Sequence, residues 1–234
     1  MEERLSRRPE AIQAMFAGIA DHYDALNRVL SLRRDVAWRR RLVEALEVAP
    51  EGPILDLACG TGDVALGVDG REVVGGDFCV DMLVLARRKA ARRGHRLGLA
   101  AADALSLPFA DATFAAVTVA FGVRNFADLD RGLREIRRVL RPAGVAAILE
   151  FQRPSRRLVG ALADAWNRLV VTPLGRAVSR DGEAYAYLPA SVATFPTGDE
   201  LLGRLTGTGF TDVRGRELTG GIAVLTVARR GEEP

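Results

Sequence analysis

Short apolar stretches alternate with helical patterns along the chain from residue 53 onward. Apolar stretches of strand length predict buried strands at residues 53–58, 71–77, 95–103, 114–122 and 144–151. Residues 80–94 and 128–144 instead repeat their apolar side chains every three or four positions, which is typical of amphipathic helices. Asp128 is placed to cap the second helix, and "RPAG" is expected to end it. Strands that alternate with helices indicate a parallel sheet joined by crossover helices.

The alternation stops after residue 151. Residues 152–198 contain no recognisable strand, and residues 198–210 predict one more helix. The next two strands, "TDVRGREL" and "GIAVLTVARR", are separated by too few residues for a helical crossover, so they should be antiparallel. We predict one domain over residues 1–234, with an N-terminal helical cap at 1–50 and a helical substrate-binding insertion at 152–198.

Basic residues are numerous but evenly distributed. The chain has 33 lysines and arginines against 30 acidic residues, and Lys89 is the only lysine. Because arginines and acids are interleaved, most arginines are expected to be solvated, and no nucleic-acid partner is predicted. The segment "MEERLSRRPE" lacks the apolar core of a signal peptide, and the longest apolar runs are about half as long as a membrane span. A soluble, cytoplasmic protein is therefore expected.

Soft metal ligands are scarce. Cys59 and Cys79 are isolated in the sequence, and His22 and His95 are the only histidines. Without a CxxC pair or a histidine cluster, no metal site is predicted. Two cysteines in a chain of this length also argue against a disulfide framework and fit a reducing cytosol.

The first strand runs into a glycine turn, "ILDLACGTGDVAL". Gly60 and Gly62 remove side chains and allow backbone dihedrals that are closed to other residues, so a ligand can approach closely. Asp77 ends the second strand, where a carboxylate can accept hydrogen bonds from a ribose diol. Neither GxGxxG nor a phosphate-binding GxxxxGK[ST] motif is present. A tight bend without a ligand is the alternative, but Asp103 at the end of the third strand favours a ligand.

These segments resemble a known family. "LDLACGTGD", the acid that ends the second strand and "DALSLPFADATF" resemble the S-adenosylmethionine-dependent methyltransferases. From about residue 15 onward the resemblance narrows to the quinone-biosynthesis C-methyltransferases, through "YDALN", "FGVRN", "EAYAYLP" and "LTGGI". That family methylates demethylmenaquinol and, in some organisms, a ubiquinone precursor. The resemblance implies a Rossmann-like class I methyltransferase, with a mostly parallel seven-stranded α/β sheet flanked by helices and an antiparallel last strand.

The resemblance also implies a set of cofactor contacts. They fall on Asp56, Gly60, Thr61, Gly62, Asp77, Met82, Asp103 and Ala104. Asp77 would hold the ribose hydroxyls of S-adenosylmethionine, and Asp103 with Ala104 would meet the adenine edge. Met82 would lie against the adenine face, although a methionine there is as often helix core.

The implied reaction needs help at the acceptor. A ring carbon is a poor nucleophile unless a neighbouring hydroxyl loses its proton. Arg124 is predicted to stabilise the phenolate or hold a water that takes the proton, and Asn125 to orient it. The alternative is that Asn125 caps a turn and Arg124 pairs with a surface acid. Tyr23 is a further candidate contact, and Asp24 and Asn27 beside it share a helix face.

The insertion is expected to hold the acceptor, a polyprenylated quinol. Its segment "RRLVGALADAWNRLVV" has an apolar stripe flanked by arginines. Such a helix can rest peripherally on the inner face of an anionic membrane, but a lid helix packed on a sheet has the same pattern and is commoner. Alternative functions are methylation of a ubiquinone precursor or another small aromatic or lipid acceptor, and a non-catalytic nucleotide-binding module. A homodimer is left open.

Overall fold

The computed structural model describes residues 23–154, 157–171, 173 and 191–231. Its centre is a seven-stranded sheet with the strand order β3-β2-β1-β4-β5-β7-β6. The strands are β1 (Ile54–Leu57), β2 (Val73–Asp77), β3 (Gly98–Ala101), β4 (Phe114–Ala120), β5 (Leu140–Phe151), β6 (Phe210–Leu218) and β7 (Ala223–Arg230). The first five are parallel, and β7 pairs antiparallel with both β5 and β6. The predicted parallel core and antiparallel closing pair are confirmed.

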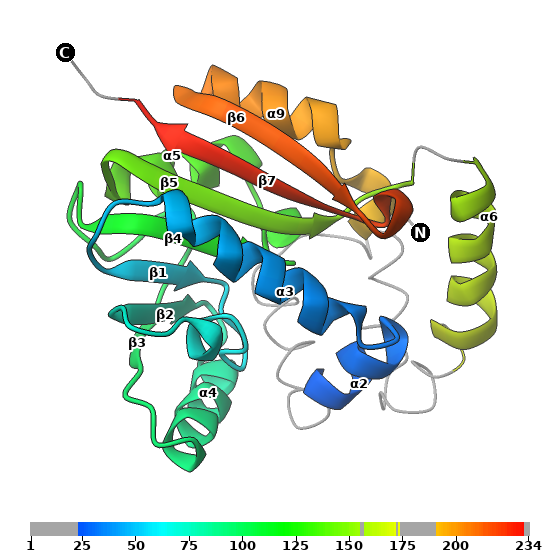
Figure 1. Ribbon diagram of the computed structural model, residues 1–234, viewed down its shortest axis with the longest axis horizontal. Helices are drawn as coiled ribbons and strands as arrows, with labels where there is room; N and C mark the ends of the chain where they lie inside the picture. The colour runs from blue at the N-terminus through cyan, green and yellow to red at the C-terminus, as the bar shows by residue number, and fades with distance from the viewer. Residues whose placement is uncertain (1–22, 155–156, 172, 174–190, 232–234) are drawn as a thin grey trace.

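Helices cover both faces of the sheet (Figure 1). The α-helices of the described residues are α2 (Tyr23–Leu30), α3 (Arg34–Glu44), α4 (Val80–Arg92), α5 (Leu129–Val139), α6 (Arg157–Trp166) and α9 (Gly198–Gly207), of which α6 lies beside the sheet. One core lies between the sheet and α5 with α9, and the other lies between the sheet and α3. Because both faces are covered, the central strands are buried on both sides and form continuous apolar runs.

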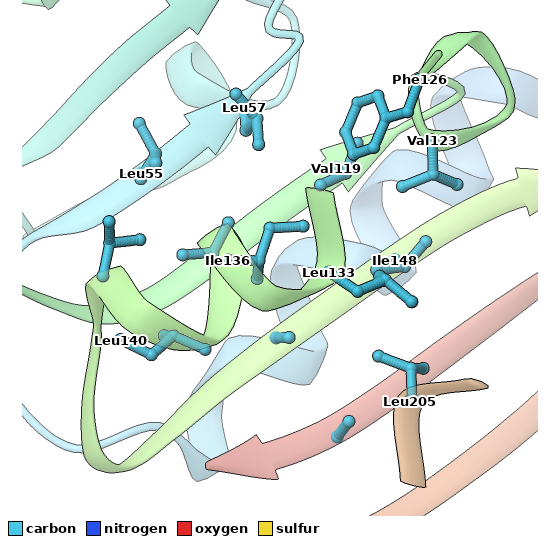
Figure 2. Close-up of a cluster of buried hydrophobic side chains, with 14 of the residues drawn as sticks. Leu55, Leu57, Val119, Val123, Phe126, Leu133, Ile136, Leu140, Ile148 and Leu205 are labelled. Carbon is cyan, nitrogen blue, oxygen red and sulfur yellow. The ribbon is translucent and has the colours of Figure 1, made fainter. Parts of the chain in front are cut away.

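Figure 2 shows the first core, where the predicted apolar stripe of α5 faces the sheet. Leu133 and Ile136 are fully buried against β-strand residues that include Leu55 and Ile148. Burying a leucine or isoleucine side chain contributes roughly 1.5–3 kcal/mol. The stripe therefore fixes how α5 sits on the sheet, and with it the ends of the strands that carry the candidate site.

The predicted end of this helix is wrong. Asp128 caps α5 as expected, since its carboxylate accepts a hydrogen bond from the backbone N–H of Arg131 at 2.9 Å. The helix ends at Val139, however, and residues 140–144 already belong to β5. The residue before Pro142 avoids the helical region, so the chain extends before the proline instead of stopping at it. The register of β5 against β4 shifts between Phe114 and Ala116, which accommodates the "RPAG" segment as an irregularity in the strand.

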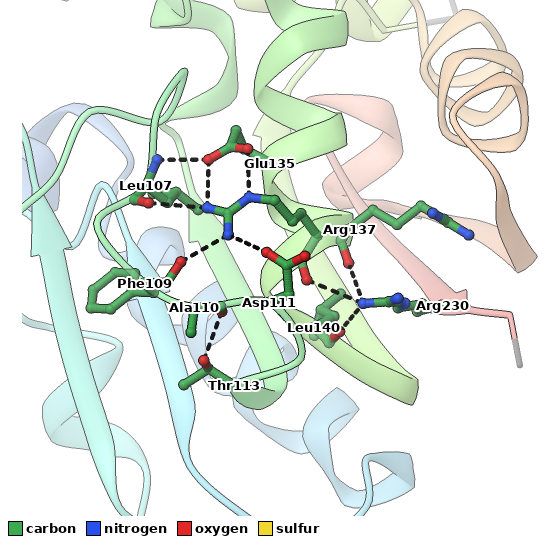
Figure 3. A network of polar contacts seen from close by, with 10 residues as sticks. Leu107, Phe109, Ala110, Asp111, Thr113, Glu135, Arg137, Leu140 and Arg230 are labelled. Atoms are coloured by element: carbon green, nitrogen blue, oxygen red, sulfur yellow. Dashed lines mark hydrogen bonds and ion pairs between the residues drawn. The ribbon is translucent and has the colours of Figure 1, made fainter. Parts of the chain in front are cut away.

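Figure 3 shows how the loop after β3 is held against α5. The guanidinium of Arg138 donates to the carbonyl oxygens of Leu107 at 3.0 Å and Phe109 at 2.8 Å. It also pairs with Glu135 and Asp111, both at 2.7 Å. The hydrogen bond and charge of Arg138 hold the pKa of Glu135 below its ordinary value, against the opposing effect of burial. The loop that begins with the predicted adenine contacts is thus fixed to the core helix.

The insertion leaves and rejoins the sheet at neighbouring points. Gln152, just after β5, donates its backbone N–H to the carbonyl of Ile222 at 3.1 Å. Its side chain lies against Gly198, where an added Cβ would stand 2.8 Å from the Gln152 Oε1. Helix α6 lies beside the sheet rather than on it (Figure 1), and the Trp166 indole N–H donates to the carbonyl of Leu30 in α2 at 3.0 Å. The residues between 174 and 190 lie outside the described part of the chain.

Candidate active site

The carboxyl ends of β1, β2 and β4 meet around one cavity, where ligands bind in doubly wound sheets. Six of the predicted site residues line it: Gly60, Asp77, Met82, Asp103, Ala104 and Asn125. Sequence reasoning missed further lining residues, including Phe78, Cys79, Phe121 and Gly122. Phe78 follows the β2 acid and is 41% exposed, so an aromatic face stands at the rim of the cavity. The cavity combines carboxylates with apolar and aromatic surfaces, a suitable lining for a nucleoside.

Asp77 is fixed by backbone amides. Its carboxylate accepts hydrogen bonds from the N–H of Gly60 at 2.7 Å and of Cys79 at 2.8 Å. Burial raises the pKa of Asp77, and these amides together with that of Phe78 partly oppose the rise. Each carboxylate oxygen has two lone pairs, so both can accept a further hydrogen bond from a ligand hydroxyl. Asp77 is therefore pre-positioned for the predicted diol contact.

Three predicted cofactor residues, Asp56, Thr61 and Gly62, do not line the cavity. Asp56 is fully buried, and its carboxylate accepts from the Thr118 hydroxyl at 2.8 Å and from the Ala65 N–H at 3.0 Å. Burial raises the pKa of Asp56 to about 7. Thr61 is also buried, and Gly62 has a φ of +81°, which a side chain would strain. The side chains of Asp56 and Thr61 and the positive φ of Gly62 thus help to shape the turn, and cofactor contacts at these three positions stay a prediction.

Two residues beside the cavity have a strained backbone conformation. Ala58 and Phe121 follow β1 and β4 and have φ values of +54° and +61°, in the left-handed region that non-glycine residues rarely adopt. Gly122 follows Phe121, and an added Cβ would stand 2.6 Å from the Ala58 Cβ. The two strand ends therefore approach too closely for a side chain at position 122. Strained residues at a ligand site persist where the surrounding packing holds them in place.

An aromatic cluster holds Phe121 from behind. Its ring stacks on that of Phe151 in β5, with the ring centroids 4.5 Å apart. The Trp38 ring of α3 packs at a tilt against Phe121, with the centroids 6.1 Å apart. The Trp38 indole N–H donates to the hydroxyl of Thr219 at 2.9 Å. Thr219 belongs to the "LTGGI" segment and Phe121 to "FGVRN". The two segments that make the resemblance most specific thus meet in space through Trp38, which sequence reasoning did not single out.

Arg124 is buried rather than solvated. Its guanidinium donates to Glu150 at 2.7 Å and to the carbonyl of Phe121, and it lies 5.7 Å from the centre of the Phe151 ring. The alternative that it pairs with a surface acid is wrong, because Glu150 is fully buried. Burial raises the pKa of Glu150, and the charge of Arg124 opposes the rise. The Nε of Arg124 is buried and has no hydrogen-bond partner among the described residues.

The remaining catalytic candidate lies at the start of α2. Tyr23 is the first residue of this helix, and its side chain lies outside the described part of the chain, so its role stays a prediction. Asp24 next to it reaches the glycine turn, where its carboxylate accepts from the Thr61 hydroxyl at 2.6 Å. The turn and the N-terminal helices are therefore in direct contact.

Other candidate sites are weaker. A larger groove lies at the opposite edge of the sheet, lined mostly by charged residues of α3 and of the loops around β1 and β2. Ligands of such sheets bind at the carboxyl ends of the strands, so we assign the site to the smaller cavity. Within the described residues, no group of His, Cys, Asp and Glu is arranged to hold a metal ion. In the same part of the chain, no helix has the length and apolarity to cross a membrane.

Comparison with known proteins shows the family of this chain. The sequence model of the ubiE/COQ5 methyltransferase family matches residues 4–230. The chain belongs to this family. It is 48% identical over 221 residues to the demethylmenaquinone methyltransferase of Thermus thermophilus. The matched region covers 92% of this chain and 100% of that protein. For the Deinococcus radiodurans enzyme of the same name, the identity is 47% over 223 residues, with coverages of 93% and 92%. The predicted methyltransferase class and its cofactor, S-adenosylmethionine, are confirmed for this member of the ubiE/COQ5 family.

Solved structures agree on the fold. The [4+2]-cyclase SpnF superposes with a TM-score of 0.66 at 16% identity and covers 97% of both chains. A phosphoethanolamine methyltransferase of Haemonchus contortus, solved with S-adenosylhomocysteine, superposes with a TM-score of 0.60 at 15% identity. It covers 80% of this chain and 51% of that chain. At such low identities the likeness concerns the fold alone, and it confirms the predicted Rossmann-like class.

Proposed function

We propose that this ubiE/COQ5 family member transfers a methyl group from S-adenosylmethionine to a ring carbon of demethylmenaquinol. The observation that carries the proposal is that "FGVRN", a specific part of the resemblance, lines the same cavity as Asp77 through Phe121, Gly122 and Asn125. The "FGVRN" segment, which carries the candidate acceptor residues, and the Asp77 carboxylate therefore line the same cavity. Family relatives that are demethylmenaquinone methyltransferases match over nearly the whole chain.

The cavity fits the cofactor. Asp77 offers two amide-fixed oxygens to a diol, and Asp103 and Ala104 offer polar groups at the next strand end. Met82 and Phe78 supply apolar surface for a base. When bound, S-adenosylmethionine supplies a methyl group that is already activated for transfer. The protein has to align donor and acceptor and keep water out.

The acceptor half of the site manages a proton. The quinol hydroxyl would lose its proton as the adjacent ring carbon takes the methyl group from the sulfonium sulfur, which would leave as the thioether. The ring hydrogen would then leave as a proton and the oxygen would regain one, so that one proton is released overall. In this proposal Arg124 stabilises the phenolate or holds a water that takes the proton, and Asn125, which lines the cavity, orients that group. Arg124 itself does not line the cavity, and Glu150 holds its guanidinium in the protein interior, so its effect on the phenolate would come from its charge or through Asn125.

Calorimetry with S-adenosylhomocysteine tests the cofactor half. We expect binding by the wild type, loss of binding in Asp77→Ala, and unchanged binding in Asp69→Ala, a matched control at an exposed position away from the cavity. Transfer of label from S-adenosylmethionine is then measured with demethylmenaquinol and with a demethylated ubiquinone precursor. Label in demethylmenaquinol alone supports the proposal, whereas label in the ubiquinone precursor alone would make the precursor the acceptor. If the wild type does not bind S-adenosylhomocysteine, the proposed reaction is refuted.

We also propose that the insertion holds the polyprenyl tail and brings α6 to an anionic membrane surface. Leu162 and Leu169 are 64% and 73% exposed, and Arg157 and Arg168 are exposed near them. Exposed apolar side chains flanked by arginines suit an interface that is apolar inside and anionic outside. Sedimentation with vesicles of anionic lipid compares the wild type with the doubly reversed Arg157→Glu, Arg168→Glu variant. Equal binding of the two would refute the membrane contact.

A further inference from the structure

Lysine occurs once in this chain, at the back of the cofactor turn. Among 33 basic residues only Lys89 is a lysine, and it lies in the last turn of α4. The two residues before it, Arg87 and Arg88, are exposed, whereas the Lys89 side chain is only 19% exposed. Lys89 therefore points toward the protein at a position where its neighbours on the helix point to solvent.

The Lys89 ammonium group is fully engaged. Its Nζ donates to the Thr61 hydroxyl at 2.9 Å and contacts carboxylate oxygens of Asp24 and Asp63 at 2.5 Å each. The Thr61 hydroxyl in turn donates to the other oxygen of Asp24 at 2.6 Å. An ammonium group has three donors on one atom, and here three acceptors converge on it. A guanidinium presents a planar fork instead, so arginine does not reproduce this arrangement.

These contacts connect three parts of the molecule. Thr61 and Asp63 belong to the glycine turn, Lys89 to α4, and Asp24 to the first turn of α2. Burial would raise the pKa of Asp63, but its hydrogen bond to Lys89 and the nearby positive charges lower it overall. Asp24 and Asp63 are both anionic acceptors of the same cation. Without Lys89, the charges of Asp24 and Asp63 would face each other, and of these contacts only the Thr61–Asp24 hydrogen bond would still join α2 to the turn.

We propose that Lys89 is a positioning residue for methyl transfer, because it fastens the start of α2 to the cofactor turn through Asp24, Thr61 and Asp63. The inference rests on the proposed function, since α2 begins with the predicted contact Tyr23. Lys89 does not line the cavity, so it acts through these residues. Misplacing a catalytic element by about 1 Å can cost on the order of a hundredfold in rate. Loss of Lys89 thus lowers kcat more than it weakens cofactor binding.

Two variants on α4 separate this role from a general effect of charge. Lys89→Met removes the ammonium group and its three contacts, and Arg88→Met removes one positive charge from an exposed position on the same helix. We expect Lys89→Met to lower kcat for demethylmenaquinol by at least about tenfold, with a smaller change in the Kd of S-adenosylhomocysteine. Lys89→Arg should show nearly the same loss of kcat, and the kcat of Arg88→Met should match that of the wild type. A kcat of Lys89→Met equal to that of Arg88→Met would overturn the proposal.

Hydrogen exchange measures the link without any turnover. Backbone amides of α2 should exchange faster in Lys89→Met than in the wild type, and Asp24→Asn should show the same increase. If the two residues form one link, the double variant exchanges no faster than either single variant. Additive effects that follow a general fall in unfolding temperature would instead mean that Lys89 only stabilises the fold, and the proposal would be wrong. If the wild type fails to methylate, the proposed function fails, while the exchange rates still decide whether Lys89 fastens α2.

Discussion

The buried carboxyl of Asp56 predicts an unusual dependence of stability on pH. Asp56 accepts from the Thr118 hydroxyl and the Ala65 N–H in a site that is 1% exposed. Asparagine has the same shape and fits this site. Its carbonyl accepts from Ala65, and its amide donates to the Thr118 oxygen once that hydroxyl rotates. Asp56→Asn therefore removes the charge while keeping both hydrogen bonds.

The magnitude follows from the pKa. Burial raises the pKa of Asp56 from 3.8 to about 7 in the folded state, a shift of about three units, or roughly 4 kcal/mol. Between these pH values the folded protein retains a proton that the unfolded chain releases, so this group makes the wild type less stable as pH rises. The cost is absent below pH 3.8 and complete above about pH 7. It is an upper limit, because relaxation and water penetration reduce the cost of a buried charge.

Urea unfolding of both proteins between pH 5 and pH 8 provides the assay. Asp56→Asn should be more stable than the wild type at pH 8, and its advantage should shrink by about 2 to 3 kcal/mol at pH 5. Other buried acids contribute equally to both proteins and cancel in the difference. Asp69→Asn at an exposed position should show no such trend. A difference between Asp56→Asn and the wild type that is constant with pH would refute the reasoning.

Three further substitutions test the site. Gly122→Ala brings a Cβ to 2.6 Å from that of Ala58. The free energy of unfolding, measured in urea, should therefore fall by about 1 to 3 kcal/mol, and calorimetry should show weaker binding of S-adenosylhomocysteine. Arg124→Met leaves Glu150 buried without its cation and should cost about 3 to 5 kcal/mol at pH 8 in urea unfolding, with partial recovery as acid protonates Glu150. Arg138→Met releases the loop after β3, and hydrogen exchange in that loop should rise together with the Kd of S-adenosylhomocysteine.

The sheet could be predicted because apolar runs and short connections follow general rules. The parallel core, the crossover helices and the closing antiparallel pair were confirmed, whereas β3, predicted as a buried strand, is exposed or half-buried along its length. The end of α5 could not be predicted, because Val139 and Leu140 suit the apolar face of a helix as well as a buried strand. Pairing of Leu140 with Phe114, a tertiary contact, decided between the two.

Within the site, backbone position was easier to predict than side-chain partners. Gly60, Asp77 and Asp103 end neighbouring strands, so parallel topology alone brings them together. The ion pair of Arg124 with Glu150 crosses from the end of β4 to β5, and nothing local in either segment signals it. The same holds for Lys89, whose partners lie 26 to 65 positions away in the sequence.

The contact between Gln152 and Gly198 has a consequence for how this scaffold can diversify. Both ends of the intervening segment are anchored beside each other at the edge of the sheet. Closing a segment between fixed points costs only about 0.6 kcal/mol for each doubling of its length. Changes in the length or sequence of this segment can therefore leave the glycine turn and Asp77 in place. If the insertion holds the acceptor as proposed, such changes would alter acceptor preference without redesign of the methyl-donor half.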